Sequence, residues 1–102
     1  MRRFLRRLIP NRGPGTRELL SGGAIVVDVR TPMEFSGGHC EGSVNIPLDS
    51  IRSEAPALRE RGVAVVTCCA SGMRSGKAAA ILSDLGIEAH NGGSWRSVAK
   101  EV

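Results

Sequence analysis

Two short runs rich in β-branched residues constrain the fold of this chain more than any other feature. They read AIVVDV at residues 24–29 and VAVVTC at residues 63–68. Short, continuous apolar runs of this kind are typical of strands buried on both faces of a sheet. Shorter strand candidates lie at 43–46 and 87–90, and helical stretches at 16–20, 31–36, 48–61 and 75–85. Strands that alternate with helices predict an α/β fold, with a central parallel sheet of four to five strands and helices on both faces.

The length of the chain allows one compact domain. Its 102 residues leave no room for a second core, and a content of 41% hydrophobic and 24% charged residues is that of a globular protein. No apolar run approaches the roughly 18 to 20 residues of a membrane-spanning helix, so we expect no transmembrane segment. Three cysteines, an odd number, argue against a disulfide-stapled secreted scaffold. We therefore predict a cytoplasmic location.

Most of the excess positive charge lies in the N-terminal tail. The net charge is +4, yet six arginines precede the first acidic residue, Glu18, and the remaining eight basic residues face ten acidic ones. Apolar residues recur at helical spacing between these arginines: Phe4, Leu5, Leu8 and Ile9. The tail is either a short basic amphipathic helix, suited to an anionic membrane surface or a partner, or a solvated extension. We divide the chain into a basic amphipathic tail and linker, residues 1–15, and a single domain, residues 16–102.

The most reactive candidate follows the second apolar run. Cys69 comes at the end of that predicted strand, and a short loop leads from it into an alanine-rich helix: Ala70, Ser71, Gly72, Met73, Arg74 and Ser75. Ligands of open parallel sheets bind at the carboxyl ends of the strands. Loop N–H groups and a helix N-terminus present partial positive charge there, which favours the nucleophilic thiolate of Cys69. Gly72 allows the turn, and Arg74 adds planar donors for an oxyanion. The alternative is an ordinary buried cysteine.

Two separate motif blocks carry a family resemblance. The first contains Asp28-Val-Arg30, Glu34-Phe35, Gly38-His39, Gly42-Ser43 and Asn45-Ile-Pro47, and the second runs from Cys69 to Ser75. In this order the blocks resemble the single-domain rhodanese family, above all its small phage-shock-type thiosulfate sulfurtransferases. The resemblance implies a rhodanese-like three-layer sandwich in which Cys69 carries a persulfide and Ala70 to Arg74 line its loop. With Ser75 at the helix start, these loop residues are the expected substrate-binding set.

The resemblance also indicates the partners. A small sulfur-containing anion such as thiosulfate would be the donor, and a thiol, cyanide or a protein would accept the sulfur. No metal or other cofactor is expected, because the reaction requires none and the His and Cys residues show no zinc spacing. No P-loop or dinucleotide-binding motif occurs either. Nucleic acid is not an expected partner, because no aromatic platform accompanies the arginines.

Two other functions remain possible for such a cysteine loop. A non-turnover persulfide carrier or interaction module would keep the cysteine without catalysing transfer to a small acceptor. Phosphatases of the rhodanese-like superfamily also combine a cysteine, a loop and an arginine. Their loop places one more residue between the cysteine and the arginine than lies between Cys69 and Arg74, so the loop here is a tighter cradle. We favour the sulfurtransferase.

Several polar residues have structural interpretations that we prefer. Asp28, Arg30 and Glu34 follow the first strand and are expected to fix its turn by ion pairs and hydrogen bonds, with substrate contact as the alternative. His39 is expected to be a hydrogen-bonded structural histidine.

For the residues next to the cysteine loop we also give a structural interpretation and its alternative. Strand alternation predicts that Cys68 points away from Cys69 into the core, with a resolving redox role as the alternative. Residues 91–95 are expected to form a turn and a rim of the site, on which Trp95 is a packing anchor or a cover.

Overall fold

The computed structural model describes residues 14–102. Residues 1–13 of the basic amphipathic tail therefore lie outside the described residues, and both alternatives for the tail stay predictions. The elements follow one another as α2 (Thr16–Ser21), β1 (Ile25–Asp28), α3 (Pro32–Ser36), β2 (Val44–Asn45), the 3₁₀ turn η1 (Leu48–Ser50), α4 (Ile51–Arg61), β3 (Val65–Cys69), α5 (Met73–Asp84), β4 (Ala89–Ser94) and α6 (Trp95–Ala99). None of the helices within residues 14–102 is long and apolar enough to cross a membrane.

The four strands form one parallel sheet in the order β2-β1-β3-β4. The two apolar runs supply its central strands, β1 and β3, which pair from Ile25 with Val65 to Asp28 with Cys68. Central strands are buried on both faces, which explains why their sequences are continuously apolar rather than alternating. The predicted α/β fold with a parallel sheet is confirmed.

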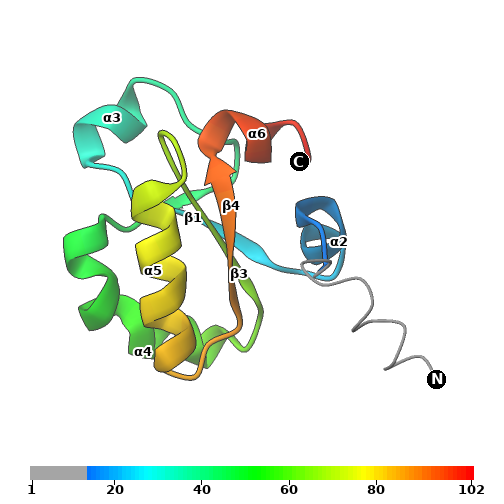
Figure 1. Ribbon diagram of the computed structural model, residues 1–102, viewed down its shortest axis with the longest axis vertical. Helices are drawn as coiled ribbons and strands as arrows, with labels where there is room; N and C mark the ends of the chain where they lie inside the picture. Colours follow the sequence, from blue (N-terminus) through cyan, green and yellow to red (C-terminus); the bar gives the residue numbers. More distant parts are fainter. Residues whose placement is uncertain (1–13) are drawn as a thin grey trace.

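Helices cover both faces of the sheet, as Figure 1 shows. On one face, α4 and α5 pack through Ile51, Ala55, Leu58, Ala78 and Leu82 against Val27, Val65 and Cys69. On the other face, α2 and α6 cover a smaller core formed by Val26, Cys40, Val66, Cys68 and Val98. Adjacent residues of β3 therefore belong to opposite layers, and the expected inward placement of Cys68, away from Cys69, is confirmed.

Several element boundaries differ from the sequence expectation. Helix α2 extends to Ser21 rather than ending at residue 20, and its N-cap is Gly15, whose N–H donates to the Glu18 carboxylate at 3.3 Å. The stretch 48–61 is divided into η1 and α4, and α5 begins at Met73 rather than at Ser75 because the left-handed Gly72 serves as its N-cap. These shifts lengthen or divide helices without moving them.

The last strand differs most from its prediction. We expected a strand at 87–90 and a turn at 91–95, but β4 continues to Ser94 and α6 follows directly. The pairing shifts between β3 and β4: Thr67 lies opposite Asn91, whereas Cys69 lies opposite Ser94. Gly93, with φ of 87°, gives the strand its extra residue. Pairing with the buried β3 thus overrides the weak strand propensity of these residues.

Gly92 packs where no side chain fits. A Cβ atom at this position would lie 2.6 Å from Val66 Cγ1, 2.7 Å from Val98 Cγ2 and 2.9 Å from the Thr67 carbonyl oxygen. Since the backbone of Gly92 is not left-handed, the requirement for glycine here is steric. The bulge in β4 therefore depends on close contact with both β3 and α6.

We predict that Gly92→Ala lowers the free energy of unfolding by roughly 1 to 3 kcal/mol, because an overpacked core must shift its neighbours. Gly22→Ala is the matched control: φ is −84° at Gly22, and the nearest contact of an added Cβ would be an ordinary 3.5 Å. That variant should stay within about 0.5 kcal/mol of the parent chain. Urea unfolding followed by circular dichroism measures both, and equal stabilities of the two variants would contradict the packing argument.

Candidate active site

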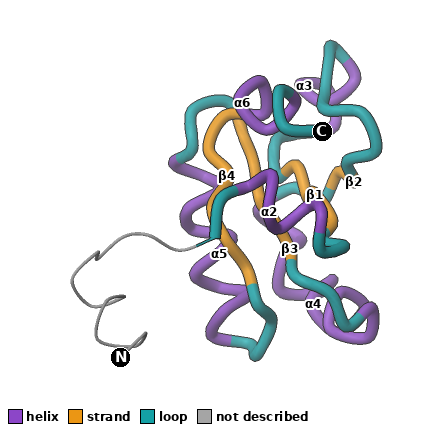
Figure 2. The backbone as a smooth tube through the Cα atoms, turned by 90° about the vertical axis from the view of Figure 1, so that its right-hand side faces the viewer, coloured by secondary structure: helices purple, strands orange, loops and turns teal. Residues whose placement is uncertain are grey.

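The carboxyl ends of β1, β3 and β4 point to one end of the molecule. Figure 1 shows α3, α6 and the start of α5 gathered at this end, around the head of the β4 arrow. Figure 2, turned by 90°, shows α3 and α6 at the same end and α4 at the opposite one. This is the end of a parallel sheet where ligands bind, and the Cys69 loop lies here because Cys69 is the last residue of β3.

The sulfur of Cys69 is surrounded by hydrogen-bond donors. The Gly72 N–H donates to Sγ at 3.0 Å and the Ser75 N–H at 3.4 Å, and the Ser75 hydroxyl lies 3.3 Å from Sγ. Cys69 is 1% exposed and also contacts the apolar layer beneath α5. The donors converge because the left-handed turn at Gly72, with φ of 107°, folds the loop back over the sulfur as α5 begins.

These donors change the acidity of Cys69. Burial alone would raise its pKa, but hydrogen bonds from the Ser75 hydroxyl and from the N–H groups of Ser75, Gly72 and Ser71 outweigh burial and lower the pKa to about 7. Cys68 has no such donors, and burial together with the nearby Asp28 raises its pKa to about 12. Burial likewise raises the pKa of Cys40. Cys69 is therefore the cysteine whose surroundings favour a thiolate at neutral pH.

The other residues of the Cys69 loop lie on its outer surface. Ala70, Ser71 and Met73 are exposed, and the Met73 side chain is among the most exposed large apolar groups of the described chain. Ser75 is fully buried, with its hydroxyl inside the loop and its carbonyl accepting from the Thr67 hydroxyl at 2.8 Å. Of the expected loop residues, Ser71, Gly72 and Ser75 thus donate to the sulfur, whereas the side chains of Ala70 and Met73 face solvent.

We expected the Arg74 guanidinium to face the Cys69 loop, but it faces Glu34 instead. Its two terminal nitrogens donate to the two carboxylate oxygens of Glu34, at 2.8 and 3.0 Å. Hydrogen bonding to Arg74, with further hydrogen bonds from Thr31, lowers the pKa of Glu34 to about 2. A bidentate pair of this kind fixes the guanidinium plane. The expected oxyanion donor is thus engaged by a carboxylate from α3, which ties the loop after β1 to the loop after β3.

Asp28 and Arg30 form the structural network expected after β1. The Asp28 carboxylate accepts two hydrogen bonds from Arg30 Nε and one from Nη2, all within 3.1 Å, and both residues are buried. Arg30 also donates to the carbonyls of Glu34 and Gly38. A buried guanidinium with this many partners fixes the strand-to-helix turn, so the structural interpretation of these two residues holds.

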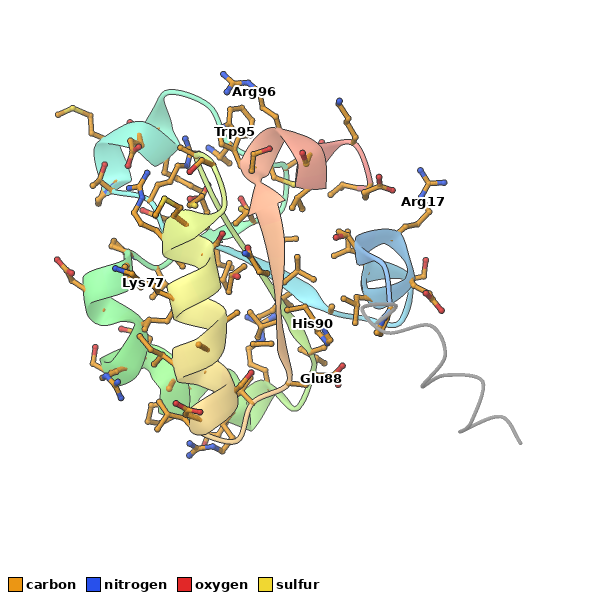
Figure 3. The ribbon with its side chains drawn as sticks, viewed as in Figure 1. Arg17, Lys77, Glu88, His90, Trp95 and Arg96 are labelled. Atoms are coloured by element: carbon orange, nitrogen blue, oxygen red, sulfur yellow. The ribbon has the colours of Figure 1, made fainter. Side chains whose placement is uncertain are left out.

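Two aromatic groups border this turn. His39 stacks on Phe35 with ring centroids 3.7 Å apart, and its Nδ1 lies 2.7 Å from the Phe35 carbonyl oxygen, in agreement with a structural role. Trp95 begins α6, with Arg96 beside it as Figure 3 shows. The guanidinium groups of Arg30 and Arg96 each lie over its ring, 5.0 and 4.6 Å from the ring centroid. Trp95 is thus a packing anchor for the turn.

Asn91 has contacts with the cysteine loop that we did not expect. Its Nδ2 donates to the Gly72 carbonyl at 3.0 Å, and its Oδ1 accepts from the Ser75 hydroxyl at 2.7 Å and from the Gly93 N–H at 3.0 Å. The sequence placed residues 91–95 at the rim of the site, but as a turn. The available signal was an asparagine directly before two glycines at a predicted strand end, a combination that also marks ordinary turns.

Comparison with known proteins identifies relatives of this chain. The rhodanese-like domain family matches residues 16–98. The thiosulfate sulfurtransferase PspE of Escherichia coli (strain K12) is 33% identical over 75 residues, which are 72% of this chain and 72% of PspE. The uncharacterized protein YqhL of Bacillus subtilis (strain 168) is 41% identical over 59 residues, or 58% of this chain, which spans only 46% of YqhL.

A solved structure agrees with the sequence matches. A rhodanese with anions from E. coli superposes with a TM-score of 0.68 at 32% sequence identity, over 76% of this chain and 93% of that chain. The fold agrees with the resemblance seen in the sequence, and the family match over residues 16–98 includes both motif blocks. This chain therefore belongs to the rhodanese-like domain family.

Proposed function

We propose that this protein is a sulfurtransferase that moves a sulfane sulfur from thiosulfate, or a similar anion, to a thiophilic acceptor through a persulfide on Cys69. The observation that carries the proposal is the set of donors on Cys69 Sγ, which lowers the pKa of a nearly enclosed thiol to about 7. The relative PspE, a thiosulfate sulfurtransferase, supports the choice of donor. Residues 16–102 would form the single catalytic domain.

The first half-reaction uses the thiolate as nucleophile. Cys69 Sγ attacks the outer sulfur of thiosulfate, a new S–S bond forms, and the bond between the two thiosulfate sulfurs breaks. Sulfite leaves with the electron pair of that bond, so no external oxidant or reductant is needed. The Gly72 and Ser75 N–H groups donate to Sγ, and we expect the donors of this loop to stabilise the negative charge on the terminal sulfur of the persulfide as well.

The second half-reaction restores the enzyme. Cyanide or an acceptor thiolate attacks the terminal sulfur, and the electron pair of the S–S bond returns to Sγ as the thiolate. A low thiol pKa makes Cys69 a good leaving group in this step. The same donors therefore serve both half-reactions.

The ion pair with Glu34 means that the donor anion must compete with a carboxylate for the Arg74 guanidinium. Both terminal nitrogens of its guanidinium are held by Glu34, and each side chain is 37% exposed. An anion at the loop mouth must share Arg74 with this carboxylate, or displace it. The solved rhodanese with anions from E. coli supports an anion site in this fold.

We predict that thiosulfate adds one sulfur atom to the peptide that contains Cys69, as mass spectrometry would detect. Cys69→Ser should abolish both this persulfide and thiosulfate-to-cyanide turnover. Cys68→Ser is the matched control and should keep both, because Cys68 lies in the opposite layer with its pKa raised to about 12. Turnover that survives in Cys69→Ser but not in Cys68→Ser would refute the assignment, whereas persulfide without turnover to cyanide would identify a carrier.

The pH dependence follows from the pKa of Cys69. The thiolate is the reactive form, so the rate of alkylation by iodoacetamide should rise with pH, reach half its maximum near pH 7 and level off above about pH 8. Peptide mapping assigns the modified residue. A midpoint near the ordinary thiol pKa of about 8.5 would show that the loop donors do not offset burial.

We further predict that Glu34→Gln lowers the KM for thiosulfate, by up to about fivefold, because the competing charge on Arg74 is removed. Steady-state kinetics at varied thiosulfate concentration measures the change. Arg74→Ala should raise the KM instead. An increase in KM for Glu34→Gln would show that the carboxylate positions Arg74 for the anion rather than masking it.

A further inference from the structure

The bulge in β4 brings one exposed side chain against the cysteine loop. Asn91 lies on the outermost strand, yet its carboxamide makes all its hydrogen bonds with the loop and with the bulge itself. Its contacts with the loop go to Gly72 and Ser75, two residues that donate to Cys69 Sγ within 3.4 Å. Asn91 itself makes no hydrogen bond with the sulfur.

Both ends of the carboxamide are used. The NH₂ end donates to the Gly72 carbonyl, and the oxygen accepts from the Ser75 hydroxyl and the Gly93 N–H. A carboxylate of the same shape could only accept, and would face the Gly72 carbonyl with a negative charge. An alanine would supply neither group. The chemistry of this position therefore requires an amide.

The loop leaves room for this carboxamide at two glycines. A Cβ atom on Gly76 would lie 3.1 Å from Asn91 Nδ2, and one on Gly72 would lie 3.4 Å from Gly93 Cα. The start of α5 and the bulge of β4 thus approach each other backbone to backbone, with Asn91 between them. This close fit fixes the carboxamide in one place relative to the loop.

The Ser75 hydroxyl links Asn91 to the sulfur. It has one proton and two neighbours that can accept it, Asn91 Oδ1 at 2.7 Å and Cys69 Sγ at 3.3 Å. With a thiol, Cys69 can donate to the Ser75 oxygen while the hydroxyl proton stays on Asn91. With a thiolate, the hydroxyl can turn to the sulfur, and Asn91 Oδ1 keeps the Gly93 N–H. The buried Ser75 is therefore hydrogen-bonded in both states.

We propose that Asn91 is a positioning residue for the Cys69 nucleophile. Its NH₂ group holds the Gly72 carbonyl, and with it the turn whose N–H donates to the sulfur, in both protonation states of Cys69, and its oxygen accepts the Ser75 hydroxyl while Cys69 is a thiol. The inference rests on the proposed function, since it assigns Asn91 a part in preparing the thiolate for sulfur transfer. It adds a residue from β4 to a site otherwise formed by the loop after β3.

The test compares Asn91→Ala and Asn91→Asp with the parent chain by the pH dependence of iodoacetamide alkylation at Cys69. Asn91→Ala removes the hydrogen bond that holds the Gly72 turn, and the Ser75 hydroxyl, which already turns to the sulfur in the thiolate state, supplies no replacement. Loss of the Gly72 N–H from the thiolate corresponds to about one pKa unit, so Asn91→Ala should move the alkylation midpoint upward and slow alkylation near pH 6 about tenfold. Asn91→Asp should move the midpoint further, because it adds a negative charge and draws the Ser75 hydroxyl away from the sulfur. The rate of persulfide formation from thiosulfate at pH 6 should fall in the same order.

Asn45→Ala is the matched control. Asn45 also bridges two carbonyls, those of Asp28 at the end of β1 and of Arg30 just after it, but it makes no hydrogen bond with the cysteine loop. It should lose stability without moving the alkylation midpoint. Thermal unfolding of every variant separates folding from reactivity, and the isosteric Asn91→Asp decides the question if Asn91→Ala does not fold.

The outcomes are distinct. Asn91 variants that melt earlier but keep the parent alkylation midpoint would overturn the positioning role, because a purely structural residue has that signature. The midpoint is measured without any sulfur donor. If the parent chain forms no persulfide with thiosulfate, the proposed function therefore fails, while the alkylation profiles still decide whether Asn91 positions the thiol.

Discussion

A sulfur atom that is both enclosed and ionisable is the constraint on which the rest of this structure depends. Taking a thiolate out of water is unfavourable unless hydrogen-bond donors replace the water. In this chain Gly72 and Ser75 supply those donors to Cys69, and the loop conformation, the start of α5 and the glycines that face β4 all bring them within reach. The neighbouring Cys68, equally buried and without such donors, has the opposite shift in pKa. One step along β3 thus separates a cysteine whose surroundings favour the thiolate from one whose surroundings favour the thiol.

The parallel sheet brings together the loops whose polar contacts surround the Cys69 sulfur. Parallel strands deliver the ends of β1, β3 and β4 to one edge, so that three loops distant in sequence meet there. Each loop is held by polar contacts of its own: Asp28 with Arg30 after β1, Asn91 with Gly72 between β4 and α5, and Glu34 with Arg74 between α3 and α5. Within the described part of the chain, every buried side-chain nitrogen and oxygen has a hydrogen-bond partner. The site is therefore a set of fully satisfied polar contacts at one edge of an apolar sheet.

The parts that could be predicted from the sequence are those with a local signal. The β-branched runs at 24–29 and 63–68 predicted the central strands, and a cysteine followed by a glycine-bearing loop placed Cys69 at a strand end. The partners of Arg74 and Asn91 could not be predicted, because Glu34 lies 40 residues away from Arg74, and Gly72 lies 19 residues away from Asn91. The continuation of β4 to Ser94 could not be predicted either, because it also depends on a distant partner. Residues of low strand propensity pair there with the buried strand β3.

The small size of α3 has a consequence for how the molecule moves. This helix has five residues and none of them is buried, so it is held by the capping pair of Thr31 and Glu34 and by tethers from Arg30 and Arg74. Segments with few apolar contacts open at much lower free energy than a sheet does. The backbone amides of α3 should therefore exchange with solvent through local opening, while β1 and β3 stay closed. Helix α3, which is tied to the cysteine loop by the Glu34–Arg74 ion pair, can thus open locally while β3, the strand that carries Cys69, stays paired.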